Sequence, residues 1–237
     1  MRSARVCRGL QLGWEPGRTC SGSTTRLEFD PRHAPTPQDW LSLTRQVALE
    51  VVGGEVFEDT GGALPALRAA LDWYPDDLWR YLVACDWRRI DQELPLMGRA
   101  ADRGDDLGSR VIAARLVDAT MHLGFLLCRA RPPYAKWRGT LFGRLPLPPG
   151  VALNLAHVLR AGDGKARAEL GRAGRARRSP GRGGSAFRGP VCLPFWDRPY
   201  PHINPELASQ LLGSITDPEI QSLPASPSRP FFGPIDE

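Results

Sequence analysis

The run GDDLGSR at residues 104–110 places two acids, a serine and an arginine where a helix is expected to begin. The first turn of a helix presents unpaired backbone N–H groups and the positive end of the helix dipole, so such a position can hold a phosphate or another anion. Asp105 and Ser109 are therefore candidate ligand-binding residues. The alternative is plain capping, in which the acids themselves satisfy those N–H groups.

A second candidate lies in PYAKW, where Lys136 stands between Tyr134 and Trp137 beside an expected helix break. An ammonium group among aromatic rings could meet the phosphate of a ligand whose ring stacks on an aromatic side chain. The alternative is a surface lysine, whose stem packs on its neighbours while the charged head stays in water.

A third candidate is the polar line Arg115, Asp118 and His122, spaced i, i+3 and i+7 on an otherwise apolar helix. Residues at this spacing share one helix face, so they could line a buried polar pocket. The alternative is a set of internally satisfied ion pairs with no ligand.

The sequence lacks the common catalytic motifs. It has no G-x-x-x-x-G-K-[ST] loop, no H-E-x-x-H pair, no G-x-S-x-G elbow and no G-x-G-x-x-G fingerprint. In SGSTTRLEFD, Gly22-Ser23 leads to Asp30, yet Arg32 occupies the second position of the Asp-x-Asp pair that holds magnesium in nucleotidyltransferases. A positive charge there repels a metal ion, so neither a catalytic residue nor a metal site is predicted.

Composition and charge favour a globular, cytoplasmic protein. The five cysteines are odd in number and form no C-x-x-C pair, which indicates reduced thiols rather than disulfides or a zinc cluster. The most apolar run, residues 119–128, is half the roughly 20 residues that a membrane helix needs. No membrane partner is therefore expected.

The net charge of +5 comes from one segment. Residues 163–190 contain eight Lys or Arg and two Asp or Glu, a local charge of +6, which leaves −1 for the rest of the chain. With only Phe187 available for stacking, the segment does not favour nucleic acid as a partner. A nonspecific nucleic-acid-binding tail, a disordered linker and a stretch of altered reading frame in a GC-rich gene remain open.

Hydrophobic periodicity predicts an all-α fold, a bundle of five or six helices. Thr36 and Pro37 start a helix that Gly53 stops, and a second begins near Pro75 with a stripe of tryptophans. The third, over 105–129, is the longest and is apolar almost all round, so it is placed at the centre of the bundle. Shorter helices are expected at 137–145, 151–161 and 204–213.

These elements suggest four parts of the chain. The predicted parts are an irregular segment 1–35, a helical domain 36–161, a basic low-complexity linker 162–190 expected to be disordered, and a C-terminal segment 191–237 with one helix.

Several stretches together resemble a family of domains of unknown function, numbered 4037. They include LEFDP, GEVFED, LDWYPDDLWRYLVACDWRRI and PPYAKWRGTLF, between about Leu27 and Leu145. This family follows a nucleotidyltransferase-like domain in bacterial and fungal proteins, and the chain is expected to begin after that catalytic core would have ended. The stretch 163–190 departs from the family pattern, which favours the altered-frame interpretation.

The resemblance implies a helical, substrate- or nucleotide-side domain that is catalytically incomplete by itself. Carried over by motif position, Lys136 and Arg88 would offer positive charge to phosphates, while Tyr134 or Trp137 would stack on a ring. Nucleotide with magnesium is implied as cofactor only together with an upstream nucleotidyltransferase-like domain, and no cofactor is expected in this chain alone. A noncatalytic ligand-binding or protein-interaction module is the alternative.

Overall fold

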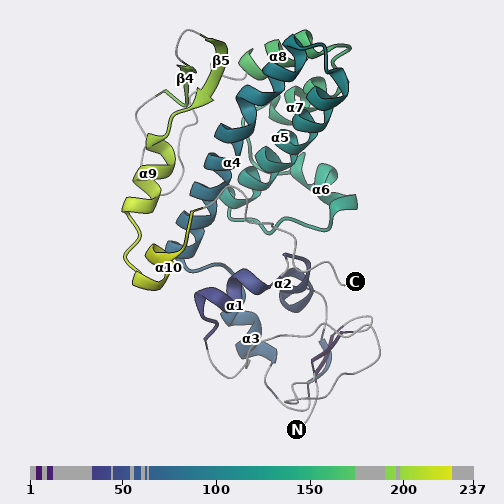
Figure 1. Ribbon diagram of the computed structural model, residues 1–237. Coiled ribbons are helices and arrows are strands. Elements are labelled where there is room, and N and C mark those ends of the chain that lie inside the picture. The colour runs from purple at the N-terminus through teal and green to yellow at the C-terminus, as the bar shows by residue number, and fades with distance from the viewer. Residues whose placement is uncertain are drawn as a thin grey trace. The chain divides into compact units, whose positions relative to one another are not determined.

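A computed structural model of the chain describes residues 4–6, 10–12, 34–43, 45–53, 56–59, 62, 64–173, 190–195 and 198–225, which are mostly helical (Figure 1). The helices are α1 Pro37–Ser42, α2 Arg45–Val52, α3 Leu64–Ala70, α4 Asp76–Asp102, α5 Asp106–Leu127, α6 Ala135–Phe142, α7 Val151–Arg160, α8 Gly164–Ala173, α9 Glu206–Gly213 and α10 Pro218–Ser222. The strands are β1 Ala4–Val6, β2 Leu10–Leu12, β3 Val56–Asp59, β4 Cys192–Phe195 and β5 Arg198–Ile203. The predicted helical class is confirmed, with two small antiparallel sheets added, ordered β2-β1-β3 and β4-β5. In the part of the chain that is described, no helix is both long enough and apolar enough to cross a membrane.

The chain divides into two compact units. One comprises residues 1–78, 133–135 and 230–237, and the other comprises 79–132 and 136–229. In the first unit, Thr36 caps α1 as the sequence predicts, and the structure shows that it forms a reciprocal capping box with Asp39. Leu43 then takes an extended conformation, so the single helix expected up to Gly53 is two helices, α1 and α2.

The core of the first unit forms around Trp40, which is 4% exposed and whose ring lies 5.1 Å from that of Tyr74. Arg68 on α3 fixes the end of α2, because its guanidinium donates to the carbonyls of Val51 and Gly53. Those carbonyls have no helical donor of their own, so the arginine side chain supplies the missing hydrogen bonds.

In the second unit, α4 and α5 form an antiparallel hairpin. The side chain of Arg115 contacts Glu93, and two turns further along α5 His122 contacts Asp86, which lies two turns back along α4. At the end of the hairpin the indole N–H of Trp79 donates to the carbonyl of Leu126 at 2.8 Å. The register of the hairpin is therefore fixed by polar contacts at three levels.

The end of α5 is closed by a residue in a strained conformation. Arg129 has a φ of 53°, in the left-handed region that favours glycine, and the N–H of Ala130 bonds to the carbonyl of Phe125. The guanidinium of Arg129 lies 4.1 Å from the centre of the Trp79 ring. A cation–π contact of this kind offsets part of the backbone strain.

A second face of α4 is covered by the C-terminal arm, defined as residues 190–195 and 198–225 (Figure 1). Tyr81 and Arg88, seven residues apart, donate to the carbonyls of Pro224 and Ala225. Further along the helix, Asp91 accepts from the N–H of Ile203 at 2.7 Å. Because residues seven apart share a helix face, one stripe of α4 holds the length of the arm.

The central helix is α4 rather than α5. It spans 27 residues against 22 for α5, and it lies between the α5 side and the C-terminal arm. On α5, Leu107 is 75% exposed and Val111 is also exposed. The prediction that the 105–129 helix is the longest and lies at the centre is therefore wrong, because its nearly uniform apolarity does not reflect burial on every side.

Gly98 on α4 is expected to be intolerant of a side chain. An added Cβ would lie 2.5 Å from a ring carbon of Tyr200 in the C-terminal arm. Gly98→Ala should therefore lower the free energy of unfolding by about 1–3 kcal/mol, measured by urea denaturation. Gly139→Ala is the matched control, since its Cβ would meet nothing within 4 Å, and it should stabilise the helix by about 0.5–1 kcal/mol. Equal effects at the two sites would contradict the close approach.

Three boundaries from the sequence need correction. Residues 164–173 form α8 instead of a disordered linker, while residues 174–189 of that segment lie outside the described residues. The C-terminal segment contains two helices and the β4–β5 hairpin, rather than one helix. The segment 1–35 includes the short strands β1 and β2, and its remaining residues up to 33 lie outside the described ones.

Candidate functional site

The start of α5 is closed by the chain's own side chains. Asp105 caps the helix by accepting from the N–H of Gly108 at 2.8 Å. Ser109 is fully buried and accepts a hydrogen bond from Arg167 on α8 at 2.9 Å. These contacts agree with the capping alternative, and the ligand-binding role of Asp105 and Ser109 stays a prediction.

Asp106 links this helix start to α8, and Arg110 links it to the loop that precedes α8. Its carboxylate accepts from Arg110 at 2.7 Å and from Arg167 at 3.0 Å, and Arg110 also donates to the carbonyl of Gly162 at 3.0 Å. The hydrogen bonds from Arg110 and then Arg167 favour the charged carboxylate, so they hold the pKa of Asp106 below its ordinary value of 3.8.

This lowered pKa predicts how Asp106→Asn should behave with pH. A carboxylate whose pKa is lower in the folded state stabilises the fold above its unfolded pKa, and it loses that contribution as pH falls through the folded value. The variant should therefore be less stable than the original chain at pH 7, and the difference should shrink below about pH 4. Urea denaturation at pH 7 and at pH 2.5 measures both differences.

Asp102→Asn, at an exposed position of α4, is the control for Asp106→Asn. It should change the free energy of unfolding little at either pH. If the Asp106→Asn difference persists undiminished at the lower pH, the proposed link between the carboxylate charge and stability fails.

The polar line on α5 is satisfied residue by residue. Arg115 contacts Glu93 at 2.9 Å, Asp118 forms an ion pair with Arg138 on α6, and His122 lies 2.6 Å from Asp86. Each partner comes from α4 or α6, so the line joins three helices. This pattern agrees with the ion-pair alternative rather than with a polar pocket.

Asp86 is a buried polar residue that the sequence did not single out. Its side chain is fully buried, one oxygen faces the imidazole of His122, and the other has no hydrogen-bond partner within the described part of the chain. A lone acid inside the apolar run YLVACDW was the available signal, because a carboxylate there requires a buried partner.

Arg88 does not point to a ligand in this structure. It is exposed, and its guanidinium donates to the carbonyl of Ala225 at 2.7 Å, where it helps to hold the C-terminal arm. Its predicted role toward phosphates is therefore not supported by the geometry.

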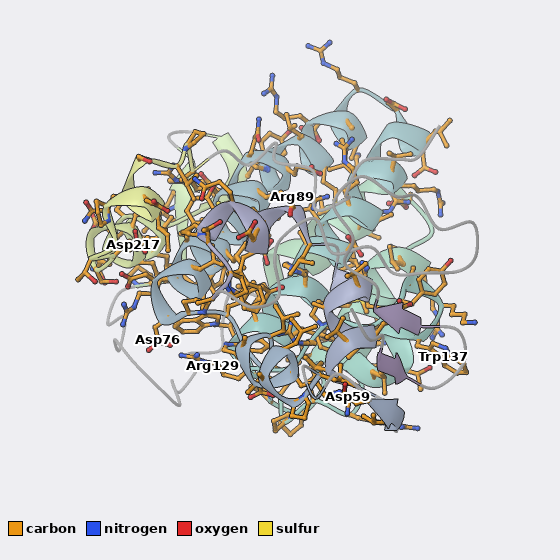
Figure 2. All side chains as sticks on the ribbon, turned by 90° about the horizontal axis from the view of Figure 1, so that it is seen from below. Asp59, Asp76, Arg89, Arg129, Trp137 and Asp217 are labelled. Carbon is orange, nitrogen blue, oxygen red and sulfur yellow. The ribbon has the colours of Figure 1, made fainter. Side chains whose placement is uncertain are left out.

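The last three candidate residues, Tyr134, Lys136 and Trp137, are all exposed. Tyr134 is 56% exposed and belongs to the first unit. In the second unit, Trp137, labelled in Figure 2, is 55% exposed. The ammonium of Lys136 lies 5.8 Å from the centre of the Trp137 ring. An exposed indole with a cation beside it is the arrangement that the other four candidates do not provide.

The inner side of α6 explains why Lys136 and Trp137 face outward. Arg138 is held by Asp118, and one turn later Phe142 is buried against the ring of Phe125, with centroids 6.0 Å apart. Residues at i and i+4 share a helix face, so Arg138 and Phe142 together form the anchor of α6. The outer edge of α6, defined here as Lys136 and Trp137, is consequently presented on a fixed support.

The described residues contain no group of three or more His, Cys, Asp and Glu side chains that could hold a metal ion.

Comparison with known proteins gives one match. Residues 40–138 match the model of a family described as Domain of unknown function (DUF4037). No curated protein and no solved structure matches the chain. The resemblance stated from the sequence is confirmed over this range, which includes α4, α5 and the outer edge of α6.

Proposed function

Because residues 40–138 match the DUF4037 family, we propose that this chain supplies the helical, ligand-side domain of a nucleotidyltransferase-like protein. In this proposal the outer edge of α6 meets a nucleotide. The observation that carries it is the 55% exposure of Trp137 beside an ammonium group. By contrast, Trp40 and Trp79 are buried, with only 4% and 8% of their surface exposed. Exposing a large indole on an anchored helix costs hydrophobic stabilisation, which a ligand in contact with the ring would recover.

The chemistry of this edge fits the two parts of a nucleotide. The indole face of Trp137 can stack on a base, while Lys136 can meet a phosphate as a mobile point charge. The anchor of α6 holds the helix that carries the ring, so little backbone entropy is lost on binding. These residues bind and orient a ligand; phosphoryl transfer and its magnesium would come from the nucleotidyltransferase-like domain.

Calorimetry with ATP, with and without magnesium, tests the proposal. ATP should bind, and Trp137→Ala should weaken binding by about 1–3 kcal/mol, the cost of losing one stacked base. Lys136→Ala should weaken it as well, whereas Lys165→Ala, at an exposed position of α8, should not. If ATP does not bind, or if all variants bind alike, the proposed ligand-binding edge is wrong.

The magnesium dependence distinguishes the main alternative, a noncatalytic ligand-binding module. The observation in favour of that alternative is Arg32, which replaces the second carboxylate of an Asp-x-Asp pair. Binding that is indifferent to magnesium supports the noncatalytic module, and metal-dependent binding counts against it. Sequencing the transcript upstream would show whether a Gly-Ser turn and an Asp-x-Asp pair are encoded there.

A nonspecific nucleic-acid-binding tail at 163–190 is the remaining alternative. Deleting that segment is a poor test, because Arg167 within it is buried against Ser109 and Asp106. Replacing Arg175, Arg177 and Arg178 with serine is a cleaner test. If the tail binds nucleic acid, these changes should reduce both the affinity and its salt dependence.

A further inference from the structure

The outward face of α6 extends beyond Lys136 and Trp137. Thr140, Gly143 and Arg144 follow Lys136 at i+4, i+7 and i+8, and all three are exposed. Backbone hydrogen bonds from Gly143 and Arg144 back to residues 139 and 141 continue the coil past the end of the helix. One continuous exposed face, called here the α6 face, therefore runs from Lys136 to Arg144.

The middle of the α6 face carries only small side chains. Gly139, Thr140 and Gly143 have short side chains or none, and a Cβ added at Gly139 would meet no atom within 4 Å. A ligand backbone can therefore approach the helix closely between the two ends, where the larger side chains stand.

The chain segment that carries the α6 face has charges of one sign. Residues 129–144 contain five basic residues and no acid; they are Arg129, Arg131, Lys136, Arg138 and Arg144. Arg138 is neutralised by its ion pair with Asp118, and within the described residues Arg144 forms no ion pair. Lys136 and Arg144 place one cationic side chain at each end of the face, roughly 12 Å apart along the axis at 1.5 Å per residue.

We propose that the α6 face binds single-stranded nucleic acid, with one base stacked on Trp137 and successive phosphates reaching from Lys136 to Arg144. The inference rests on the proposed function, since it uses the same outer edge, and it specifies the ligand as a strand rather than a mononucleotide. A mononucleotide stacked on Trp137 places its phosphates near Lys136 and leaves Arg144 without a role.

The aromatic residue separates a single strand from other polyanions. Proteins that bind single strands combine a basic track with an exposed ring on which a base stacks, and in a duplex the base faces are covered by neighbouring pairs. An acidic peptide would complement the positive charge of the α6 face, yet it has no base that could stack on Trp137. The indole and the spaced cations therefore favour a single strand.

The test is fluorescence anisotropy of the full chain with a labelled ten-nucleotide oligo(dT), and ATP, duplex DNA and poly-glutamate serve as competitors. The oligonucleotide should quench indole fluorescence, and unlabelled strand should displace it far better than duplex, ATP or poly-glutamate. Trp137→Ala should weaken binding about 5- to 150-fold, the range for one stacked base. Arg144→Ala should reduce the slope of log affinity against log salt by about 0.7, the value for one phosphate contact on a single strand.

Two matched variants and circular dichroism control the experiment. Arg160→Ala and Lys165→Ala remove exposed cations from α7 and α8, and both should keep the affinity of the original chain. Unchanged helical circular dichroism shows that the α6 variants remain folded, as their exposure predicts.

Three results would overturn the inference. If ATP binds through Lys136 and Trp137 while Arg144→Ala leaves oligonucleotide affinity and its salt slope unchanged, the strand is wrong but the proposed function stands. Displacement by poly-glutamate as effective as that by unlabelled strand would assign the α6 face to acidic proteins. If neither ATP nor the oligonucleotide binds, both this inference and the proposed function fail.

Discussion

Asp86→Ala should lower the free energy of unfolding by about 3 kcal/mol, among the largest effects expected of one substitution in this chain. The carboxylate is fully buried, and its Oδ2 lies 2.6 Å from Nδ1 of His122. Removing it leaves the imidazole nitrogen buried without that partner and opens a cavity between α4 and α5. Urea denaturation followed by far-ultraviolet circular dichroism measures the loss.

Asp102→Ala removes the same side chain from an exposed position on the same helix, and it should change stability by less than about 0.5 kcal/mol. A double variant, Asp86→Ala with His122→Ala, should cost less than the two single changes added together, because the partners share one interaction. Additive losses would show that the buried pair is not a coupled unit.

Arg167→Ala should be almost as damaging, with a loss of about 3 kcal/mol and exposure of α8. The guanidinium is fully buried and donates to Ser109, to Asp106 and, at 3.4 Å, to the carbonyl of Ala161. Without it, the hydroxyl of Ser109 remains buried and no longer accepts the hydrogen bond from the guanidinium. Hydrogen exchange should therefore rise first in residues 161–169, before the rest of the second unit opens.

The matched control for Arg167→Ala is Lys165→Ala, which removes a long cation from the exposed side of the same helix. It should leave both stability and exchange rates nearly unchanged. If the two variants behave alike, α8 is not integral to the fold. The altered-frame interpretation of residues 163–173 would then regain support.

Local signals in the sequence predicted the parts of the fold that depend on neighbouring residues. Thr36 with Pro37 and Asp39 marks the start of α1, and Asp105 caps α5, because capping needs only a few consecutive residues. The predicted stripe of α4 is buried at Trp79, Val83 and Ile90, whereas its second tryptophan, Trp87, is half-buried. Periodicity identifies these faces without any knowledge of what covers them.

The sequence could not identify contacts between residues that lie far apart in the chain. Arg167 looked like one more arginine in a low-complexity stretch, and only the approach of α8 to α5 shows that it is buried. Arg88 and Asp91 lie on the polar face of α4, which solvent would normally cover, yet the C-terminal arm from more than 100 residues away lies there. No local rule specifies which distant segment will supply such a cover.

The candidate site shows the same difference between local signals, which the sequence contains, and long-range contacts, which it does not reveal. The proline break before Lys136 and Trp137 is visible in the sequence, and it places both residues at the start of a new helix. The support beneath them comes from Asp118 and Phe125 on another helix, and spacing alone could not identify those contacts. Of the seven residues singled out, four already form hydrogen bonds within the chain, and their ligand-binding roles stay predictions; these are Arg88, Asp105, Ser109 and Arg115.

The way the C-terminal arm clasps α4 has a practical consequence for anyone who produces the domain. A polypeptide trimmed to residues 40–138 would retain every position matched by the family. It would lose the carbonyls to which Tyr81 and Arg88 donate and the Ile203 N–H that donates to Asp91. Such a fragment should express poorly and aggregate, whereas one extended to residue 225 should remain monodisperse. The boundaries of the family match thus differ from those of the segment that is expected to fold as one unit.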